Sequence, residues 1–280
     1  MGTHKPNDTE SYYNRGIAYY KKREYDEAIA DFSQVIKREP DHTDAYYHRG
    51  NAYRDEVDFD RAIADYTKAI ELKPDHADAY YHRGKLYAED EAYDKAIADF
   101  SMTTKIEPTH ADGHGYRADL YRDIGEYEKA IEGYNIEIKL RPDNPDTYRK
   151  RGDTYFEKGE YDQAIIDYSQ AIELHPTFTE AYTKRGWAYC RAGKFESAIQ
   201  DYTSVLEMNP HLIKLYAIRG IIWLHIKKWD YAKSNLTFAR NLGVDVIDLF
   251  HKLCGSVTHF EQIHQIQLSE DIKAIIESKC

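Results

Sequence analysis

Small, aromatic and polar positions along the chain repeat with a period of 34 residues between residues 11 and 248. One slot of the period holds glycine in six of seven cases: Gly16, Gly50, Gly84, Ala118, Gly152, Gly186 and Gly220. Alanine follows 12 residues later in every period, an aromatic ring follows in six, and proline closes six. Such self-similarity is typical of a solenoid, in which each unit covers the apolar face of its neighbour.

One period, residues 45–78, predicts two helices. Small and aromatic residues recur there at three- and four-residue spacing, first as Tyr46, Gly50 and Tyr53 and then as Ala62, Tyr66 and Ala69. This spacing places each set on one face of a helix. We therefore expect helices over about 45–56 and 60–72, with a turn between them and an end at Pro74. In the resulting hairpin, Gly50 is expected to face Ala62.

The slots for aromatic, Gly, aromatic, Ala, aromatic and Pro residues resemble the tetratricopeptide repeat (TPR) family over residues 11–248. The resemblance implies an all-α fold, a right-handed superhelical solenoid of antiparallel helix pairs with a concave groove lined mainly by the first helices. It also implies a non-catalytic scaffold or adaptor that binds a protein or peptide partner in that groove. The predicted organisation is an N-terminal tail (1–10), seven repeats (11–44, 45–78, 79–112, 113–146, 147–180, 181–214 and 215–248) and C-terminal capping helices (249–280).

An arginine precedes the glycine slot in all seven periods, where the TPR family usually has an apolar residue. Sixteen residues later, five periods carry an aspartate: Asp31, Asp65, Asp99, Asp167 and Asp201. The other two periods carry Gly133 and Asn235 at this position. Because Arg49 and Asp65 lie equally far from the turn, the hairpin brings them to one level, and we expect a bidentate ion pair. The alternative is a row of arginines that binds anions along the groove.

The groove-facing slots follow from the resemblance, and they vary between repeats while the packing slots do not. The predicted partner-binding residues are Tyr13, Asn14, Tyr47, His48, Asn51, Arg54, Tyr81, His82, Lys85, Tyr116, Asp119, Arg122, Arg149, Lys150, Asp153, Phe156, Lys184, Trp187, Arg191, Ile218 and Ile221. Tyr and His dominate the N-terminal end, mixed charge the middle and apolar residues the C-terminal end. Tyrosine suits interfaces because its large ring has a polar tip. The alternative is that exposed positions drift without any partner.

An acidic residue lies six positions before the glycine slot in six periods: Glu10, Asp44, Asp78, Asp112, Asp146 and Glu180. These positions fall at the start of each first helix, where carboxylates cap backbone amides and complement the helix dipole. We favour that capping role. The alternative is an acidic track that binds a basic ligand.

Six histidines form loose pairs around the turns between the first four repeats: His42, His48, His76, His82, His110 and His114. A zinc site needs about four converging ligands, which such pairs on a solenoid seldom supply, so we interpret them as turn or solvated histidines. The chain contains no Gly-rich phosphate loop, HExxH sequence or nucleophile–base motif. We therefore expect no catalysis, no cofactor and no metal site.

The fourth repeat and the last 32 residues depart from the pattern. Repeat four has Gly113 and Gly115 in its first helix and Glu137 in place of a small residue, which predicts a softer joint or a specialised contact. The tail 249–280 carries apolar stripes typical of short helices. Because a solenoid needs a cap on its last apolar face, we expect the tail to be that cap, and it could cover the Ile218–Leu224 patch.

Composition narrows the function further. The 280 residues carry a net charge of −11, which argues against a nucleic-acid partner, and no apolar run is long enough to span a membrane. Three separated cysteines and the lack of a secretory signal favour a cytoplasmic location. The oligomeric state stays open, with a monomer favoured. A regulatory subunit that docks on an enzyme or larger assembly is the alternative function, and an RNA-binding helical repeat is disfavoured.

Overall fold

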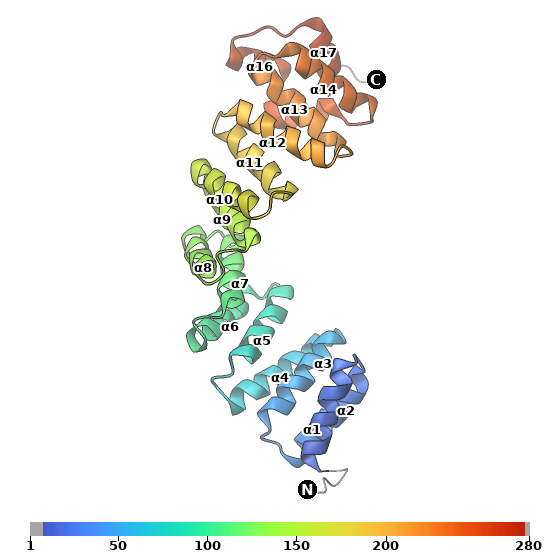
Figure 1. The fold of residues 1–280 in the computed structure, drawn as a ribbon, viewed down its shortest axis with the longest axis vertical. Coiled ribbons are helices and arrows are strands. Elements are labelled where there is room, and N and C mark those ends of the chain that lie inside the picture. Colours follow the sequence, from blue (N-terminus) through green and yellow to red (C-terminus); the bar gives the residue numbers. More distant parts are fainter. Residues whose placement is uncertain (1–7, 278–280) are drawn as a thin grey trace. The chain divides into compact units, whose positions relative to one another are not determined.

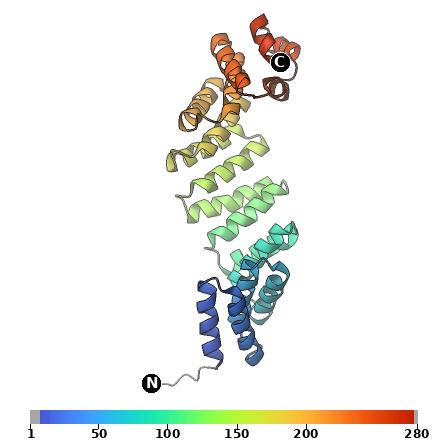
Figure 2. The same cartoon turned by 90° about the vertical axis from the view of Figure 1, so that its right-hand side faces the viewer.

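A computed structural model describes residues 8–277, which form helices and contain no strand (Figure 1). Residues 1–7 of the predicted tail and Cys280 lie outside the described residues. The chain divides into two compact units at residues 142 and 143. Within each unit, consecutive helices pack against each other in chain order, as Figure 2 also shows.

The N-terminal unit contains four helix pairs. Their bounds are α1 Thr9–Lys21, α2 Tyr25–Arg38, α3 Thr43–Asp55, α4 Phe59–Leu72, α5 Ala77–Glu89, α6 Tyr93–Ile106, α7 Ala111–Asp123 and α8 Tyr127–Leu140. The two helices expected within 45–78 are thus confirmed, with α3 beginning two residues early and α4 beginning one residue early. An all-α solenoid of tandem helix pairs is the observed architecture.

The C-terminal unit continues the pairs and ends in three shorter helices. The bounds are α9 Pro145–Lys158, α10 Tyr161–Leu174, α11 Thr179–Arg191, α12 Phe195–Met208, α13 Ile213–His225, α14 Trp229–Asn241, α15 Val246–Cys254, α16 Val257–His264 and α17 Glu270–Glu277. In the described part of the chain, every helix is too short or too polar to cross a membrane.

The turn inside each of the seven helix pairs has one residue with positive φ, always in the same slot: Arg23, Val57, Glu91, Gly125, Gly159, Gly193 and Lys227. Glycine adopts this conformation without steric cost, whereas the β-branched Val57, at φ +63°, does not. The turn is therefore imposed by the packing of the helix pair and not by glycine alone.

The predicted Arg–Asp pairs are confirmed in all five repeats that carry the aspartate. In each, the arginine donates from Nε and Nη2 to the two carboxylate oxygens, and the pair links the two helices of one hairpin. For Arg83 and Asp99 both distances are 2.8 Å. The arginines are engaged within the fold, so they do not form a free anion-binding row.

The same arginines also tie neighbouring pairs together, which the sequence analysis missed. Nη1 of Arg83 donates to the hydroxyl of Thr67 at 2.9 Å, in the second helix of the preceding pair. Arg49 bonds Ser33 and Arg185 bonds Ser169 in the same manner. Each such arginine therefore joins three helices of two repeats.

Gly50 packs most closely against Tyr66 and Asp65 of the second helix, and the expectation that it faces Ala62 stays a prediction. A Cβ added to Gly50 would lie 2.9 Å from a ring carbon of Tyr66. The glycine slot is thus required because the aromatic ring four residues after Ala62 lies flat against the backbone of the first helix.

Repeat four keeps its packing by exchanging large and small residues between its two helices. Ala118 replaces the usual glycine, and Gly133 replaces the usual aspartate opposite it. A Cβ on Gly133 would lie 2.8 Å from the Cβ of Ala118. In the same pair, Glu137 is buried in the space that Gly115 leaves, where a Cβ would lie 2.5 Å from Oε2 of Glu137. Both departures are therefore compensated locally, and a softer joint stays a prediction.

The last helices cover the apolar face of α13. Ile218 and Ile221, predicted as groove residues, are 6% and 2% exposed within a core that also contains Phe250, Phe260 and Ile272. Their prediction as partner-binding residues is wrong in this conformation because α15 and α16 occupy that surface. The alternative that the tail covers this patch is the one observed.

Candidate partner-binding groove

Six rings of the N-terminal unit form a continuous chain of ring contacts across α1, α3, α5 and α7. We call this set the aromatic ladder, and its members are Tyr13, His48, Tyr47, His82, Tyr81 and Tyr116, in order of contact. The centroid distances between successive rings are 5.8, 5.1, 5.9, 5.2 and 5.8 Å. The first helices thus bring all six predicted Tyr and His groove residues of this unit onto one surface.

Three histidines in the turns cap the helices that carry the ladder. Nδ1 of His42, His76 and His110 accepts a hydrogen bond from a backbone N–H in the first turn of α3, α5 and α7, respectively. Each of these imidazoles also packs against a ladder tyrosine, at 5.0, 4.8 and 4.7 Å. The interpretation as turn histidines is confirmed for these three.

His48 and His82 are half-buried and packed against rings, so the interpretation of them as solvated histidines is wrong. The His48 ring stacks on Phe32 at 5.8 Å, and the His82 ring stacks on the buried Tyr66 at 6.0 Å. Nδ1 of His82 also lies 2.9 Å from Nη1 of Arg54, which can only donate, so His82 accepts there as a neutral imidazole. Burial, and then the charge of Arg54, lowers the pKa of His82 to about 3.

We predict that His82 makes the fold sensitive to acid. The pKa of His82 is lower in the folded than in the unfolded state, so its imidazole is protonated between about pH 3 and pH 6.5 only when the chain is unfolded. The free energy of unfolding is therefore highest above pH 6.5 and falls as the pH drops below that value. At pH 5 the loss reaches about 2 kcal/mol. In His82→Tyr, which copies Tyr116 of the next repeat, the urea midpoint should fall less between pH 7 and pH 5. The exposed His211→Tyr is the control, and an equal pH dependence in all three proteins would contradict the prediction.

The acidic row does not cap the helices of the N-terminal repeats in the way we favoured. In α3 and α5 the side-chain cap is the histidine two residues earlier. Asp44 and Asp78 are exposed, and among residues 8–277 neither forms a hydrogen bond or ion pair. Asp112 differs because it pairs with Arg141 at 2.6 Å. Two carboxylates beside the aromatic ladder therefore remain accessible.

The slot after each glycine serves the buried ring of its own hairpin. In three of the four hairpins whose ring is tyrosine, its hydroxyl donates to the slot: Tyr66 to Asn51 at 2.8 Å, Tyr134 to Asp119 at 2.6 Å and Tyr168 to Asp153 at 2.7 Å. In the sixth repeat the slot holds Trp187, and the Tyr202 hydroxyl has no hydrogen-bond partner among residues 8–277. Where the ring is phenylalanine, the slot holds Ile17 or Lys85. Internal hydrogen bonding therefore explains Asn51, Asp119 and Asp153 at this slot, and Asn51 and Asp153 are buried. The sequence signal is the pairing of residues 15 apart.

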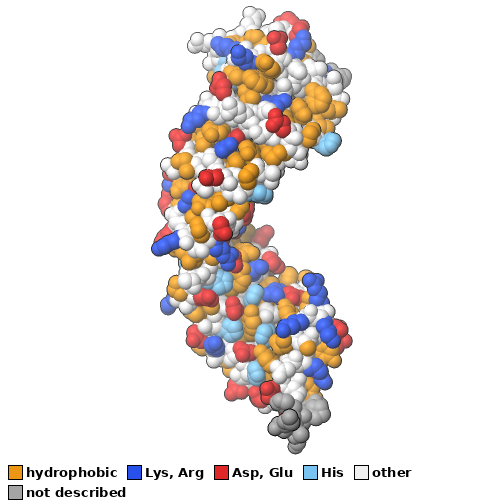
Figure 3. Space-filling view, in the orientation of Figure 1, with side chains coloured by type: hydrophobic (Ala, Val, Ile, Leu, Met, Phe, Trp, Pro, Cys, Tyr) orange, Lys and Arg blue, Asp and Glu red, His pale blue; other side chains and the backbone are white. Residues whose placement is uncertain are grey.

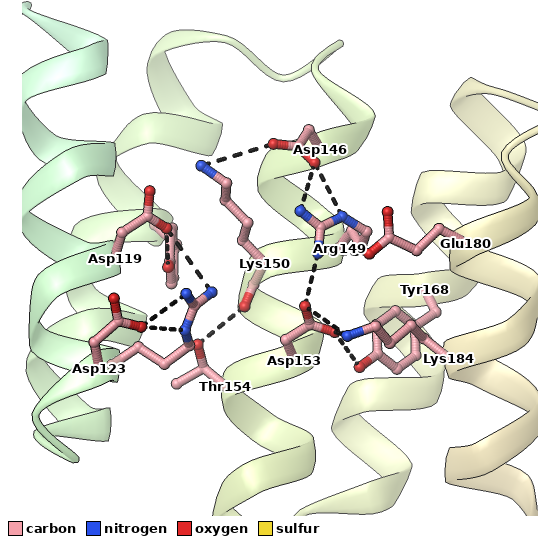
Figure 4. Close-up of polar contacts among 12 residues, drawn as sticks. Asp119, Asp123, Asp146, Arg149, Lys150, Asp153, Thr154, Tyr168, Glu180 and Lys184 are labelled. Carbon is pink, nitrogen blue, oxygen red and sulfur yellow. Dashed lines mark hydrogen bonds and ion pairs between the residues drawn. The ribbon is translucent and has the colours of Figure 1, made fainter. Parts of the chain in front are cut away.

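Mixed charges in the middle of the chain pair with one another inside each unit (Figure 4). In the N-terminal unit, Arg122 contacts Asp119 and Asp123. In the C-terminal unit, Arg149 bonds Asp146 and Asp153 at 2.8 and 2.7 Å and lies 3.3 Å from Glu180, while Lys150 lies 3.7 Å from Asp146 (Figure 4). Most of these predicted site residues are thus satisfied by their own neighbours.

A cavity of about 570 Å³ lies between α9 and α11 in the C-terminal unit. Its lining residues are Asp153, Phe156, Glu157, Tyr168, Thr183, Lys184, Trp187 and Arg191. Five of them are among the predicted partner-binding residues, Thr183 and Glu157 occupy groove slots without having been predicted as contacts, and Tyr168 was not expected in the groove. Lys184 lies 3.3 Å from Asp153, and Arg191 donates to the hydroxyl of Tyr161 at 2.9 Å. The lining combines aromatic faces with two accessible cations.

Of the remaining predicted residues, Asn14 is exposed at the start of the groove, and Lys85 lies over the last rings of the ladder. No group of three or more His, Cys, Asp or Glu side chains in residues 8–277 is arranged to hold a metal ion. Cys190 and Cys254 are free thiols, and burial raises the pKa of each to about 12.

Three TPR family models match the chain. One tetratricopeptide repeat model matches two overlapping segments, 13–75 and 49–111, and a second matches residues 179–212. A TPR repeat model matches the overlapping segments 118–158 and 152–193. Comparison with curated protein sequences gave no match.

Solved structures of repeat proteins resemble the fold. A structure of MamA is 29% identical and covers 59% of this chain and 90% of its own, with a TM-score of 0.57. YrrB, described as a TPR protein with an unusual peptide-binding site, is 21% identical, with coverages of 70% and 97% and a TM-score of 0.60. The C-terminal part of a TPR repeat-containing protein from Cytophaga hutchinsonii is 17% identical, with coverages of 84% and 98% and a TM-score of 0.73.

Proposed function

The chain belongs to the tetratricopeptide repeat family, and on that premise we propose that it is a non-catalytic adaptor whose groove binds a peptide or a segment of a protein partner. The observation that carries the proposal is the cavity between α9 and α11. Its size is in the range of small-ligand and side-chain pockets, and aromatic walls with a few polar groups are typical of such sites. Phe156 and Trp187 are suited to receive an apolar side chain, while Lys184 and Arg191 can contact the backbone carbonyls beside it.

The groove chemistry favours binding over catalysis. Asp153 accepts hydrogen bonds from Tyr168 and Arg149, and Lys184 is also in contact with it. These contacts fix the buried carboxylate and with it the shape of the cavity, and they engage its oxygens in hydrogen bonds and an ion pair. YrrB, which shares the fold, is described as having a peptide-binding site, and this supports the same use of the groove here. We place the adaptor in the cytoplasm because its two described thiols are free.

Substitutions in the cavity should abolish partner capture without unfolding the protein. We expect Trp187→Ala to remove the largest aromatic wall and Lys184→Glu to reverse the charge at the rim, so each should lose the partners that the wild type recovers in affinity capture with mass spectrometry. The control is Ile166→Ala, which changes a 59% exposed residue on α10 outside the cavity. Retention of every partner by both cavity variants would refute groove binding.

A further inference from the structure

The two units of the chain differ sharply in charge. Residues 1–142 contain 30 Asp and Glu against 21 Lys and Arg, a net charge of −9, whereas residues 143–280 contain 19 against 17, a net charge of −2. Nearly all of the −11 therefore belongs to the unit that carries the aromatic ladder. A surface of one sign attracts and orients partners of the opposite sign.

Two accessible carboxylates lie along the ladder itself. Asp44 lies on α3 between His42 and His48, whose rings both contact Tyr13, and Asp78 lies on α5 between His76 and His82, whose rings both contact Tyr47. Each carboxylate therefore lies on the part of its helix that faces the preceding tyrosine, and burial and the charge of that carboxylate raise the pKa of the tyrosine. Figure 3 shows histidine side chains on the visible face of this unit, next to hydrophobic and acidic side chains. Each of the first two tyrosines thus presents a ring close to a carboxylate that has no cation as a partner within the described residues.

A ring face next to a carboxylate is a site for a cationic side chain. The chain already uses the ring faces in this way. Nζ of Lys85 lies 5.3 Å from the centroid of Tyr116 and 5.9 Å from that of Tyr81, and it forms no ion pair in the described part of the chain. Elsewhere Arg38 lies 4.5 Å above the Tyr12 ring. The slot of Lys85 holds Ile17 and Asn51 in the two preceding repeats, so the rings of Tyr13 and Tyr47 have no cation of their own there.

The spacing of the tyrosines matches an extended peptide. His48 bridges Tyr13 and Tyr47 with centroid distances of 5.8 and 5.1 Å, so the two tyrosine centroids are at most about 11 Å apart, and packed helices such as α1 and α3 lie about 8–10 Å apart. Tyr47 and Tyr81 are bridged by His82 in the same manner, at 5.9 and 5.2 Å. Three residues of an extended or polyproline II chain span about 9–11 Å.

We propose that the aromatic ladder binds an extended, basic segment of the partner protein, in which Arg or Lys recurs at about every third residue. The cations stack on Tyr13 and Tyr47 and pair with Asp44 and Asp78. Lys85 occupies the third position with the chain's own cation and so limits the affinity. This proposal rests on the proposed adaptor function and assigns the chemistry of the partner segment at the N-terminal unit.

The test uses fluorescence anisotropy with labelled 12-residue peptides at low salt. One probe has Arg at every third position separated by Ser and Pro, a second has Glu in place of Arg, and a third has the same composition as the first with its arginines consecutive. We expect the first to bind best and the second not to bind. Asp44→Asn/Asp78→Asn should weaken binding by about 3- to 10-fold, because it removes two exposed charge pairs, each of which contributes modestly. Lys85→Gln should strengthen binding by about 2- to 5-fold.

The two variants change opposite charges on exposed or partly exposed positions, so a shared folding defect cannot produce opposite effects. The proposal that the segment is basic would be overturned if the Glu peptide bound more strongly than the Arg peptide, or if Lys85→Gln bound the Arg peptide more weakly than the wild type does. Equal binding of the third probe would overturn the three-residue spacing. If the Arg peptide does not bind while Trp187→Ala and Lys184→Glu still lose captured partners, the ladder proposal fails and the adaptor function stands.

Discussion

Arg83→Ala is expected to destabilise the N-terminal unit by about 3–5 kcal/mol, because it leaves the Asp99 carboxylate buried without its partner. The side chains of Arg83 and Asp99 are 14% and 7% exposed, and the substitution removes both bidentate hydrogen bonds and the bond to Thr67. The measurement is the midpoint of guanidinium or urea denaturation, together with the melting temperature. The free energy of unfolding should fall by more than the free energy of partner binding.

Two other arginines of the same slot give matched controls. In the repeat of Arg117, Gly133 takes the slot of the aspartate, and among residues 8–277 Arg117 donates to the hydroxyls of Ser101 and Thr104, at 3.3 Å each. Arg117→Ala therefore leaves no partner carboxylate unpaired. Arg15 pairs with Asp31, whose side chain is 7% exposed like that of Asp99, but Arg15 itself is 50% exposed. Solvent can therefore reach Asp31 when Arg15 is removed, and Arg15→Ala should cost less than Arg83→Ala. If Arg83→Ala were as stable as these controls and lost its partner, the anion-binding alternative would replace the structural role.

Burial explains why these pairs matter in this fold. It raises the pKa of Asp65, Asp167 and Asp201, although the paired arginine acts in the opposite direction. Burial therefore disfavours the charged form of these carboxylates, and the paired arginine offsets part of that free-energy cost. In return, the arginine links its own hairpin to the preceding one through Ser or Thr, which gives the solenoid a polar connection between repeats.

Sequence reasoning recovered what depends on contacts within one hairpin. The helices of 45–78 follow from three- and four-residue spacing, and the Arg49–Asp65 pair follows from symmetry about the turn. Both rest on residues at most 16 apart, whose relative positions are fixed by helix geometry. The close approach of the Tyr66 ring to Gly50 was not predicted, although these two residues are also only 16 apart.

Contacts between repeats were harder to predict. The His82 ring is held by Tyr66 of the preceding hairpin and by Arg54, so its burial depends on neighbours 16 and 28 residues away in another repeat. Read alone, a histidine beside a tyrosine on a polar helix indicates an exposed position. The buried polar slot of Asn51 could have been found, since a buried tyrosine in place of phenylalanine 15 residues later favours an acceptor there.

Deletion of residues 249–280 is expected to make the protein aggregate, because it removes the helices that cover the last apolar face. The core of this end combines Ile218, Ile221 and Leu224 of α13 with residues of α15, α16 and α17. Without the tail, these α13 side chains become a contiguous exposed patch, which soluble monomers rarely carry. Soluble yield and light scattering of the truncated and full-length proteins measure the effect. An equally soluble and stable truncation would instead assign the tail to partner docking.

A point substitution separates capping from a general requirement for the tail. Phe260 is 2% exposed, and its ring centroid lies 5.6 Å from that of Phe250 and 5.0 Å from that of His225. Phe260→Ala should therefore lower the free energy of unfolding by about 3–5 kcal/mol. Ile263, three residues later in the same helix, is 59% exposed, so Ile263→Ala should leave the denaturation midpoint within about 0.5 kcal/mol of the wild type. The difference between these two neighbours arises only if α16 packs on α13 in solution. Equal, small effects of both substitutions would show that the tail is detached, and Ile218 and Ile221 would then return as candidate partner contacts.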